Sequence, residues 1–233
     1  MKLVLFDIDG TLLWTDGAGR RAVHRALVAE AGTAGPIDTY RFDGKTDPQI
    51  ITDLLRLGGH PDAGRTELLA AVSERYLALL AEELARTPGA TRLLPGVAAL
   101  LAALVPYEAE GRALVGLLTG NFATGAALKL RSGGLDPDRF AVGAYGSDSG
   151  SRADLPAIAV RRAVAARARA FPPEQVVVLG DTPADVACAA GIGARSIGVA
   201  TGYYDVAALR TAGATAVFES LVDTGALLDI LLA

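Results

Sequence analysis

Short apolar runs without polar alternation recur along the chain, and they constrain its fold more than any other feature. A strand with one face in water alternates apolar and polar residues, whereas a strand buried on both faces does not. Such runs are therefore typical of a parallel sheet that helices cover on both sides. The runs are Leu3–Phe6, Ala113–Leu118, Phe140–Ala144, Gln175–Leu179, Ser196–Val199 and Ala216–Phe218.

Helical patterns separate the later runs and follow the last one. Strand and helix in alternation predict an α/β fold with a doubly wound, mostly parallel, Rossmann-like sheet. The predicted helices are Ala123–Ser132, Leu155–Ala170, Pro183–Ala190, Val206–Ala212 and Leu221–Leu232.

The stretch from about Trp14 to Gly89 breaks this alternation. It contains no convincing strand, and its turns are rich in Gly, Pro and Asp. Its helical patterns cover Ala18–Ala31, Pro48–Leu57 and Arg65–Ala85. We therefore predict an α/β core formed by residues 1–14 and 90–233, with an all-helical cap, residues 15–89, inserted after the first core strand.

Composition narrows the classes of function. Of the 233 residues, 51% are hydrophobic, which is enough to bury a substantial core. The formal net charge of −4 argues against a nucleic-acid partner, because such partners usually require a basic face. No apolar stretch approaches the length that spans a bilayer, so we expect no membrane partner. The single cysteine, Cys188, cannot form an intramolecular disulfide, which indicates a reducing, cytoplasmic location, and we expect a monomer or a homodimer.

Four polar clusters stand where predicted strands end. In an open α/β sheet, ligands bind beyond the carboxyl ends of the strands, so these clusters should converge on one site. Turn capping, which Asp and Thr often perform, does not explain four converging clusters. The clusters are Asp7–Thr11, Thr119–Asn121, Arg152 and Gly180–Asp185.

The carboxylates in these clusters point to phosphoryl transfer. A carboxylate can attack phosphorus directly, and a divalent cation can offset the repulsion between an anionic nucleophile and an anionic substrate. Hard oxygen ligands of the kind that Mg²⁺ binds are present at Asp7, Asp9, Asp181 and Asp185. The sequence therefore predicts a Mg²⁺ cofactor and a small-molecule phosphate ester as the ligand.

Three motifs resemble those of the haloacid dehalogenase superfamily of phosphohydrolases, and more narrowly those of its phosphoglycolate-phosphatase-like branch. The resemblance covers nearly the whole chain, and the motifs occur in the family's order. They are Asp7-Ile8-Asp9-Gly10-Thr11, Leu117-Leu118-Thr119-Gly120-Asn121 and Gly180-Asp181-Thr182-Pro183-Ala184-Asp185.

The resemblance implies a role for each carboxylate. Asp7 would be the nucleophile and a metal ligand. Asp9 would protonate the leaving group and then activate water, with its backbone carbonyl on the metal. Asp181 would ligate Mg²⁺, and Asp185 would support the metal through water or from a position behind the direct ligands.

The resemblance also implies a phosphate-binding site. Thr119 and nearby backbone N–H groups would hold the phosphoryl oxygens. The residues that would supply these N–H groups are Ile8, Gly120 and Asn121.

The chain departs from the family pattern at one cation. The family usually places a lysine after the third strand, but no lysine occurs between Ser147 and Arg169. We predict that Arg152 serves instead, because a guanidinium stays charged and can bridge a carboxylate and a phosphoryl oxygen. The alternative is that Arg152 is a solvated loop residue and that another cation serves.

The predicted cap should cover the site, exclude water and select the leaving group, as mobile lids generally do. Two cap residues are candidate substrate contacts: Lys45, in the turn Asp43–Asp47, and Arg20, which opens the first cap helix. Pro48 would occupy the first position of the next helix, with Thr46 or Asp47 as its cap. The alternative for Lys45 is a solvated lysine in a capped turn.

Together these patterns favour a Mg²⁺-dependent phosphatase that hydrolyses a small organic phosphomonoester through an aspartyl-phosphate intermediate. Phosphoglycolate and sugar phosphates are the candidate substrates. The alternative is a phosphomutase similar to β-phosphoglucomutase, which uses the same core and differs in whether the cap admits water. A non-catalytic binding protein on this scaffold is a third hypothesis, against which the intact Asp7, Asp9, Thr119 and Asp181 argue.

Overall fold

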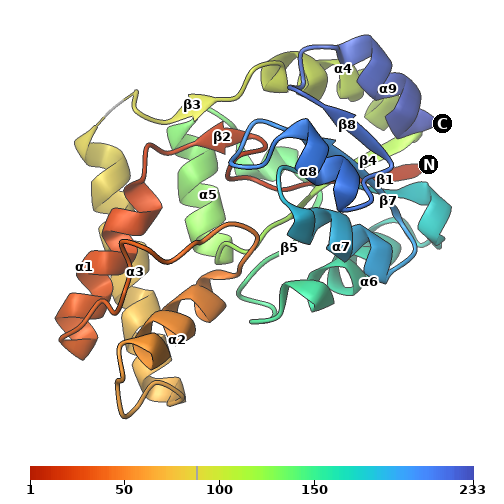
Figure 1. Cartoon of the computed structure of the whole chain (residues 1–233). Helices are drawn as coiled ribbons and strands as arrows, with labels where there is room; N and C mark the ends of the chain where they lie inside the picture. Colours follow the sequence, from red (N-terminus) through yellow and green to blue (C-terminus); the bar gives the residue numbers. More distant parts are fainter. Residues whose placement is uncertain (88) are drawn as a thin grey trace.

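A six-stranded parallel sheet forms the centre of the protein, with strand order β5-β4-β1-β6-β7-β8 (Figure 1). The computed structural model describes residues 1–87 and 89–233. Helices flank the sheet, so the predicted α/β, Rossmann-like fold is confirmed. The strands are β1 (Lys2–Phe6), β4 (Ala113–Leu118), β5 (Val142–Ala144), β6 (Val176–Gly180), β7 (Arg195–Val199) and β8 (Ala216–Phe218).

The register of the central strands brings the motifs to one edge of the sheet. At the end of β1, Phe6 lies opposite Leu117 of β4 and Leu179 of β6. The three strands therefore end at nearly the same level. Asp7 and Thr119, which follow β1 and β4, consequently start from adjacent positions at the carboxyl edge.

Both faces of the sheet are buried, which explains the absence of polar alternation. Val4 and Phe6 of β1 belong to the apolar cluster that also contains residues of α4 and α9. Leu3 and Leu5 point to the opposite cluster, with residues of α6 and α7. The core helices are α4 (Val97–Ala109), α5 (Ala123–Ser132), α6 (Leu155–Arg167), α7 (Pro183–Gly191), α8 (Val206–Thr211) and α9 (Thr224–Leu232), with short 3₁₀ helices η1 (Pro137–Arg139), η2 (Arg152–Asp154) and η3 (Pro173–Gln175).

Three core helices differ from the sequence prediction. Helix α6 ends at Arg167 rather than Ala170, because Ala168 adopts a left-handed conformation, φ +49°, that ends the helix. Helix α4 was not predicted, because its residues are almost uniformly apolar and show no helical periodicity. Helix α9 begins at Thr224 rather than Leu221, since the Asp223 side chain caps it by accepting a hydrogen bond from Ala226 N–H. Among the described residues, no helix combines the length and the apolarity needed to cross a bilayer.

Helices α1 (Ala18–Ala31), α2 (Asp47–Leu57) and α3 (Thr66–Arg86) form the helical unit that we call the cap. They pack around an apolar cluster of their own, to one side of the sheet (Figure 1). Thr46 caps α2 by accepting a hydrogen bond from Gln49 N–H, as the sequence indicated.

A two-stranded antiparallel pair, β2 (Leu13–Trp14) and β3 (Arg92–Leu93), connects the cap to the core. The prediction that the stretch from about Trp14 to Gly89 contains no strand is therefore wrong at Trp14, which belongs to β2. A two-residue strand is too short to show any alternation in sequence. The proposed boundaries of residues 1–14, 15–89 and 90–233 stay a prediction.

Candidate active site

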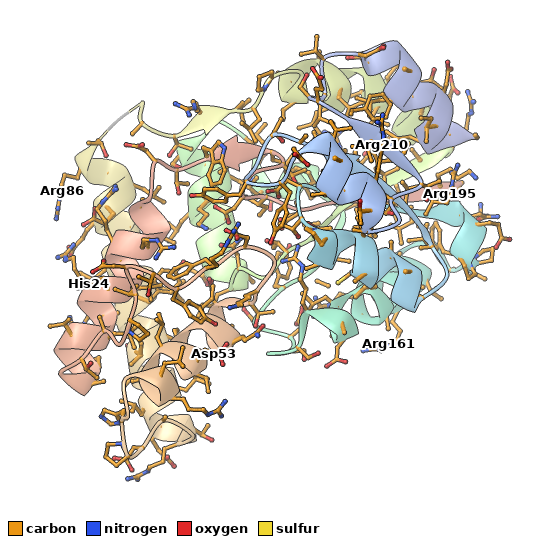
Figure 2. All side chains as sticks on the ribbon, viewed as in Figure 1. His24, Asp53, Arg86, Arg161, Arg195 and Arg210 are labelled. Carbon is orange, nitrogen blue, oxygen red and sulfur yellow. The ribbon has the colours of Figure 1, made fainter. Side chains whose placement is uncertain are left out.

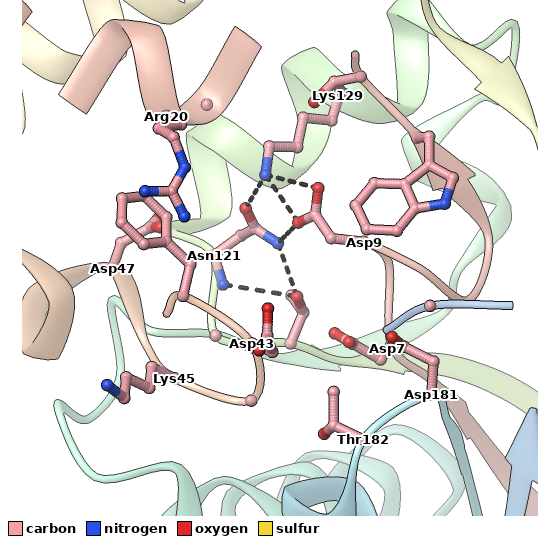
Figure 3. Close-up of a pocket in the computed structure, with 18 of the residues that line it drawn as sticks. Asp7, Asp9, Arg20, Asp43, Lys45, Asp47, Asn121, Lys129, Asp181 and Thr182 are labelled. Atoms are coloured by element: carbon pink, nitrogen blue, oxygen red, sulfur yellow. Dashed lines mark hydrogen bonds and ion pairs between the residues drawn. The ribbon is translucent and has the colours of Figure 1, made fainter. Parts of the chain in front are cut away.

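A cavity of about 380 Å³ lies at the carboxyl edge of the sheet, between the core and the cap. Figure 3 shows its side chains converging from the strand ends, from α5 and from the cap. All the site residues predicted from the sequence line this cavity except Ile8 and Asp185. Ile8 presents only its backbone near the site, since its side chain is fully buried, and Asp185 lies behind the lining.

Asp7 directly follows β1 and is only 5% exposed. Its backbone N–H donates to Leu179 O at 2.9 Å, which fixes the residue at the strand end. Burial raises the pKa of Asp7 to about 7, and the nearby carboxylates of Asp185 and Asp9 add to the increase. The guanidinium of Arg152 opposes it. The ionised form of Asp7 therefore depends on positive charge in the site.

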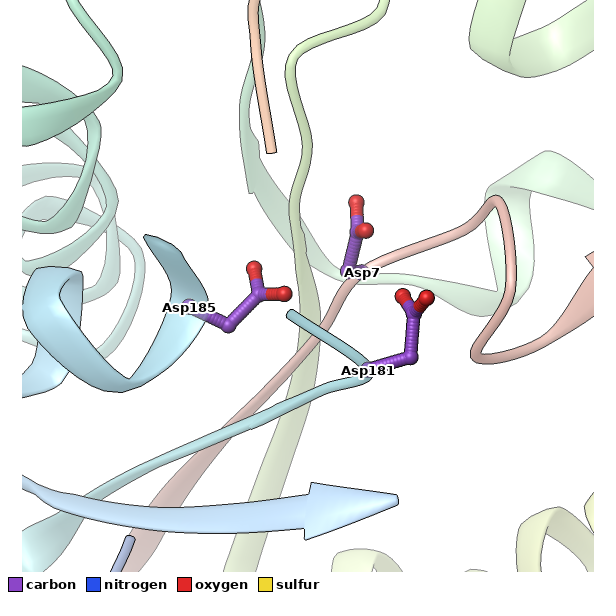
Figure 4. Close-up of side chains that lie close together, drawn as sticks. All are labelled: Asp7, Asp181 and Asp185. Atoms are coloured by element: carbon purple, nitrogen blue, oxygen red, sulfur yellow. The ribbon is translucent and has the colours of Figure 1, made fainter. Parts of the chain in front are cut away.

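The ionised form of Asp181 also depends on positive charge in the site. Burial raises its pKa well above the usual range, and the carboxylates of Asp185 and Asp7 raise it further. Oxygens of Asp7, Asp181 and Asp185 all lie within 4.8 Å of one another (Figure 4). Three buried carboxylates with hard oxygen atoms fit a divalent cation such as Mg²⁺.

Two glycines create the space around the Asp181 carboxylate. A Cβ on Gly10 would lie 2.3 Å from Asp181 Oδ2, and a Cβ on Gly202 would lie 1.8 Å from the same atom. Gly10 also has φ +80°, which disfavours other residues. Any side chain at either position would therefore displace the carboxylate from its place in the cluster.

Both carboxylate oxygens of Asp185 have partners. Its Oδ1 accepts a hydrogen bond from Arg152, and its Oδ2 accepts one from the Thr182 hydroxyl at 2.7 Å. Thr182 N–H also donates to Oδ2 at 3.1 Å, which completes a capping box at the start of α7. Asp185 thus orients Arg152 and α7, and the predicted support of a metal from behind its direct ligands stays a prediction.

Arg152 opens η2 beneath the cavity and is 8% exposed, so the alternative of a solvated loop residue is wrong. Its Nη2 lies 3.4 Å from Asp7 Oδ2 and pairs with Asp185. Burial lowers the pKa of Arg152, but the two carboxylates raise it above its usual value, so the guanidinium stays charged. Among the described residues, its buried Nε has no hydrogen-bond partner.

Thr119 and Asn121 link the second motif to Asp9. The Asn121 side-chain amide donates to Thr119 Oγ1 at 2.8 Å and to Asp9 Oδ2 at 2.8 Å. Because the Thr119 hydroxyl accepts from Asn121, its own proton is available to donate toward the cavity. This arrangement suits a contact between Thr119 and a phosphoryl oxygen.

Lys129 of α5 is a site residue that the sequence prediction missed. Its side chain is only 6% exposed, and its Nζ lies 2.9 Å and 2.7 Å from the two carboxylate oxygens of Asp9. Burial lowers the pKa of Lys129, but the carboxylates of Asp9 and Asp47 raise it above its usual value. A signal existed in the sequence: Lys129 follows Gly125 and Ala126 at helical spacing, on the apolar face of α5.

The cap contacts the second motif through Asp47 at the start of α2. Asp47 N–H donates to Gly120 O at 2.8 Å, and its side chain accepts from Phe122 N–H at 2.8 Å. Burial raises the pKa of Asp47 to about 6, although Lys129 and the Phe122 N–H lower it. A Cβ on Gly120 would lie 2.0 Å from Lys45 O, so this close approach requires glycine.

The two predicted cap contacts differ in their surroundings. Within the described part of the chain, Lys45 forms no ion pair, and its Nζ lies 3.7 Å from the centre of the Tyr40 ring. The Arg20 guanidinium instead donates to the carbonyls of Ile37 and Tyr40 and stacks over Phe42. Lys45 is therefore free to bind an anion, whereas Arg20 braces the loop before α2. Substrate binding by either residue stays a prediction.

Comparison with known proteins identifies the family. A model of the haloacid dehalogenase-like hydrolases matches residues 1–193. The chain belongs to this family. Haloacid dehalogenase-like hydrolases are generally phosphatases that use a divalent metal, and the buried aspartate cluster fits such a metal. No match appears among the curated proteins.

Solved structures share the fold of this haloacid dehalogenase-like hydrolase over its full length. A hydrolase from Pseudomonas syringae is 23% identical, with a TM-score of 0.75 and 100% of each chain covered. A predicted phosphoglycolate phosphatase from Haemophilus somnus is 18% identical, with a TM-score of 0.70 and 97% of each chain covered. A candidate β-phosphoglucomutase from Thermotoga maritima is 22% identical, with a TM-score of 0.64 and 100% of each chain covered.

Proposed function

We propose that this protein is a Mg²⁺-dependent phosphatase of the phosphoglycolate-phosphatase-like branch, which hydrolyses a small organic phosphomonoester through a phosphorylated Asp7. One observation carries the proposal: Asp7 is a buried carboxylate that lies beside the Arg152 guanidinium and forms an acidic cluster with Asp181 and Asp185, in a cavity that also contains Asp9. A nucleophile, a charge-compensating group and a candidate proton donor thus lie together.

The first half-reaction transfers the phosphoryl group to the protein. An Asp7 oxygen forms a bond to phosphorus while the bond between phosphorus and the leaving-group oxygen breaks, and Asp9 gives its proton to that oxygen. Thr119 donates a hydrogen bond to a phosphoryl oxygen, and Arg152 balances the charge that accumulates beside Asp7. When bound by Asp7 and Asp181, Mg²⁺ supplies further positive charge at the phosphoryl oxygens.

The second half-reaction restores Asp7. Asp9, now a carboxylate, accepts a proton from water as the water oxygen attacks phosphorus and the bond to Asp7 breaks. Inorganic phosphate leaves, and Asp9 again carries the proton for the next cycle. Atoms and charge balance with water as the only co-reactant.

A phosphate-release assay in Mg²⁺ tests this function. We expect inorganic phosphate from phosphoglycolate or from one of a panel of sugar phosphates. A phosphomutase, the second candidate, would instead convert one sugar phosphate into an isomer with little free phosphate, and the shared fold with a candidate β-phosphoglucomutase supports testing for it. Absence of both products over the whole panel would favour a non-catalytic binding protein.

Arg152→Ala is expected to lower kcat/KM by roughly 10²-fold, the loss typical of removing a charged contact to the transition state. Arg152→Lys should recover part of the activity because it restores the charge without the planar fork. Steady-state kinetics on the best substrate would measure both effects.

Arg161→Ala is the matched control for Arg152. Arg161 lies on α6, and its exposed side chain is on the outside of the core, away from the cavity (Figure 2). Its removal should change kcat/KM by no more than a few-fold. Arg162 is a poorer control, since it ties Asp148 to the carbonyl of Gly143. Equal effects of Arg152→Ala and Arg161→Ala would refute the assignment of Arg152.

Lys45→Ala is expected to raise KM for the best natural substrate more than for para-nitrophenyl phosphate. A cap residue contacts the leaving group, and the artificial ester replaces that group with an uncharged ring. Steady-state kinetics with both esters would measure the difference. Equal, small effects on the two esters would instead indicate a lysine that only packs on Tyr40.

A further inference from the structure

Lys129 is a buried charged residue to which the reaction above assigns no role. Its Nζ contacts both oxygens of Asp9, and it also donates to Asn121 Oδ1 at 2.6 Å (Figure 3). A Cβ on Gly19 of the cap would lie 3.6 Å from Nζ, so the ammonium is enclosed between α5 and α1. The side chain thus reaches its partners from a fixed, mostly dry position.

Asp9 needs such an external restraint. Its side chain is 33% exposed, more than that of Asp7 at 7%, and Asp9 lies in the turn beyond the end of β1. Without a restraint, a carboxylate at the cavity wall could rotate about its two side-chain torsion angles into several positions. Holding a proton-transfer group in one orientation is a large part of its catalytic efficiency.

The contacts around Asp9 leave one oxygen position open. A carboxylate has about four lone-pair sites. Lys129 contacts Oδ1 and Oδ2, and Asn121 donates to Oδ2, so the second site on Oδ1 is the one that remains. That site is where Asp9 would carry the proton that passes to the leaving-group oxygen.

We propose that Lys129 is a positioning residue that, with Asn121, orients Asp9 so that Oδ1 delivers the proton to the leaving group. The inference rests on the proposed phosphatase function. In the step concerned, the oxygen–phosphorus bond breaks, phosphorus bonds to Asp7, and the proton moves from Asp9 Oδ1 to the departing oxygen. Lys129 itself neither gains nor loses a proton.

A leaving-group series separates this role from a purely structural one. Para-nitrophenolate departs readily without a proton, whereas phenolate departs with difficulty. We expect Lys129→Met to lower kcat/KM for phenyl phosphate by about 10²-fold, and for para-nitrophenyl phosphate by no more than a few-fold. The value of kcat/KM reports the first half-reaction, in which the leaving group departs.

Arg131→Met is the matched control, since Arg131 is an exposed cation two residues further along α5. It should leave both esters within about two-fold of wild type, the scatter expected for a surface change. If wild type hydrolysed neither ester in Mg²⁺, the phosphatase proposal itself would fail. Equal losses on both esters in Lys129→Met would overturn only the role of Lys129.

A double-mutant cycle with Asp9→Asn provides the second measurement. If Lys129 acts through Asp9, adding Lys129→Met to Asp9→Asn should change kcat/KM for phenyl phosphate by less than about two-fold, although Lys129→Met alone lowers it by about 10²-fold. If the losses of the two single variants multiplied in the double variant, the two residues would act independently and the inference would be overturned. Should Lys129→Met fold poorly, Lys129→Gln keeps a donor without the charge, and it should show the same dependence on the leaving group.

Discussion

Asp7→Asn is expected to lower kcat by roughly 10⁴-fold or more, as removal of a covalent nucleophile typically does. The amide keeps the shape of the side chain but cannot attack phosphorus. Because burial opposes the ionised form of Asp7, the neutral amide should not destabilise the fold. Turnover assays and thermal unfolding of the variant would measure the two effects.

Asp16→Asn is the matched control for Asp7→Asn. Asp16 also lines the cavity, but it is exposed, and its φ of +50° is one that Asn tolerates. It should retain activity within a few-fold of wild type. Mass spectrometry must show that the amide introduced by Asp7→Asn has not deamidated back to a carboxylate. With that established, more than a few per cent of wild-type kcat in Asp7→Asn would rule out Asp7 as the nucleophile.

Chelation of divalent metal is expected to lower kcat by roughly 10³-fold, because a bound cation contributes several kcal/mol of charge stabilisation. Mg²⁺ should restore activity. Ca²⁺ should not, since it prefers more ligands and longer bonds, which would alter the position of the Asp7 oxygens. Full activity in EDTA would refute the metal role.

Metal binding can also be measured without activity. A cation that binds only the folded protein raises the unfolding temperature. We expect Mg²⁺ to stabilise the wild type and to stabilise Asp181→Asn much less, since Asp181 lies in the buried acidic cluster. An equal shift in both proteins would place the cation elsewhere.

The sheet could be predicted because burial on both faces leaves a local trace in the sequence. Leu3–Phe6 and Ala113–Leu118 are apolar throughout, and the structure places them at the centre of the sheet. Helix α4 could not be found in this way. Its residues are as apolar as a buried strand, so periodicity does not distinguish the two.

Some residues of the site could likewise be predicted from local sequence patterns, whereas others could not. Asp7 and Thr119 follow strand ends, so topology alone predicts that they meet. The contact of Lys129 with Asp9 joins residues 120 positions apart, and it depends on how α5 rotates against the sheet and the cap. The contact of Asp47 with Phe122 likewise depends on how the cap docks. Such contacts are set by packing between elements, which no local pattern encodes.

The hydrogen bonds between Asp47 and the second motif have a thermodynamic consequence. The backbone of Gly120 and Phe122, which follows Thr119, the proposed phosphate contact, is held partly by the cap itself. If the proposed function is correct, undocking the cap loosens the loop that would hold the phosphoryl group, and a ligand that orders this loop makes undocking less favourable by the same free energy. The affinity for the phosphoryl group and the fraction of molecules with the cap docked should therefore change together.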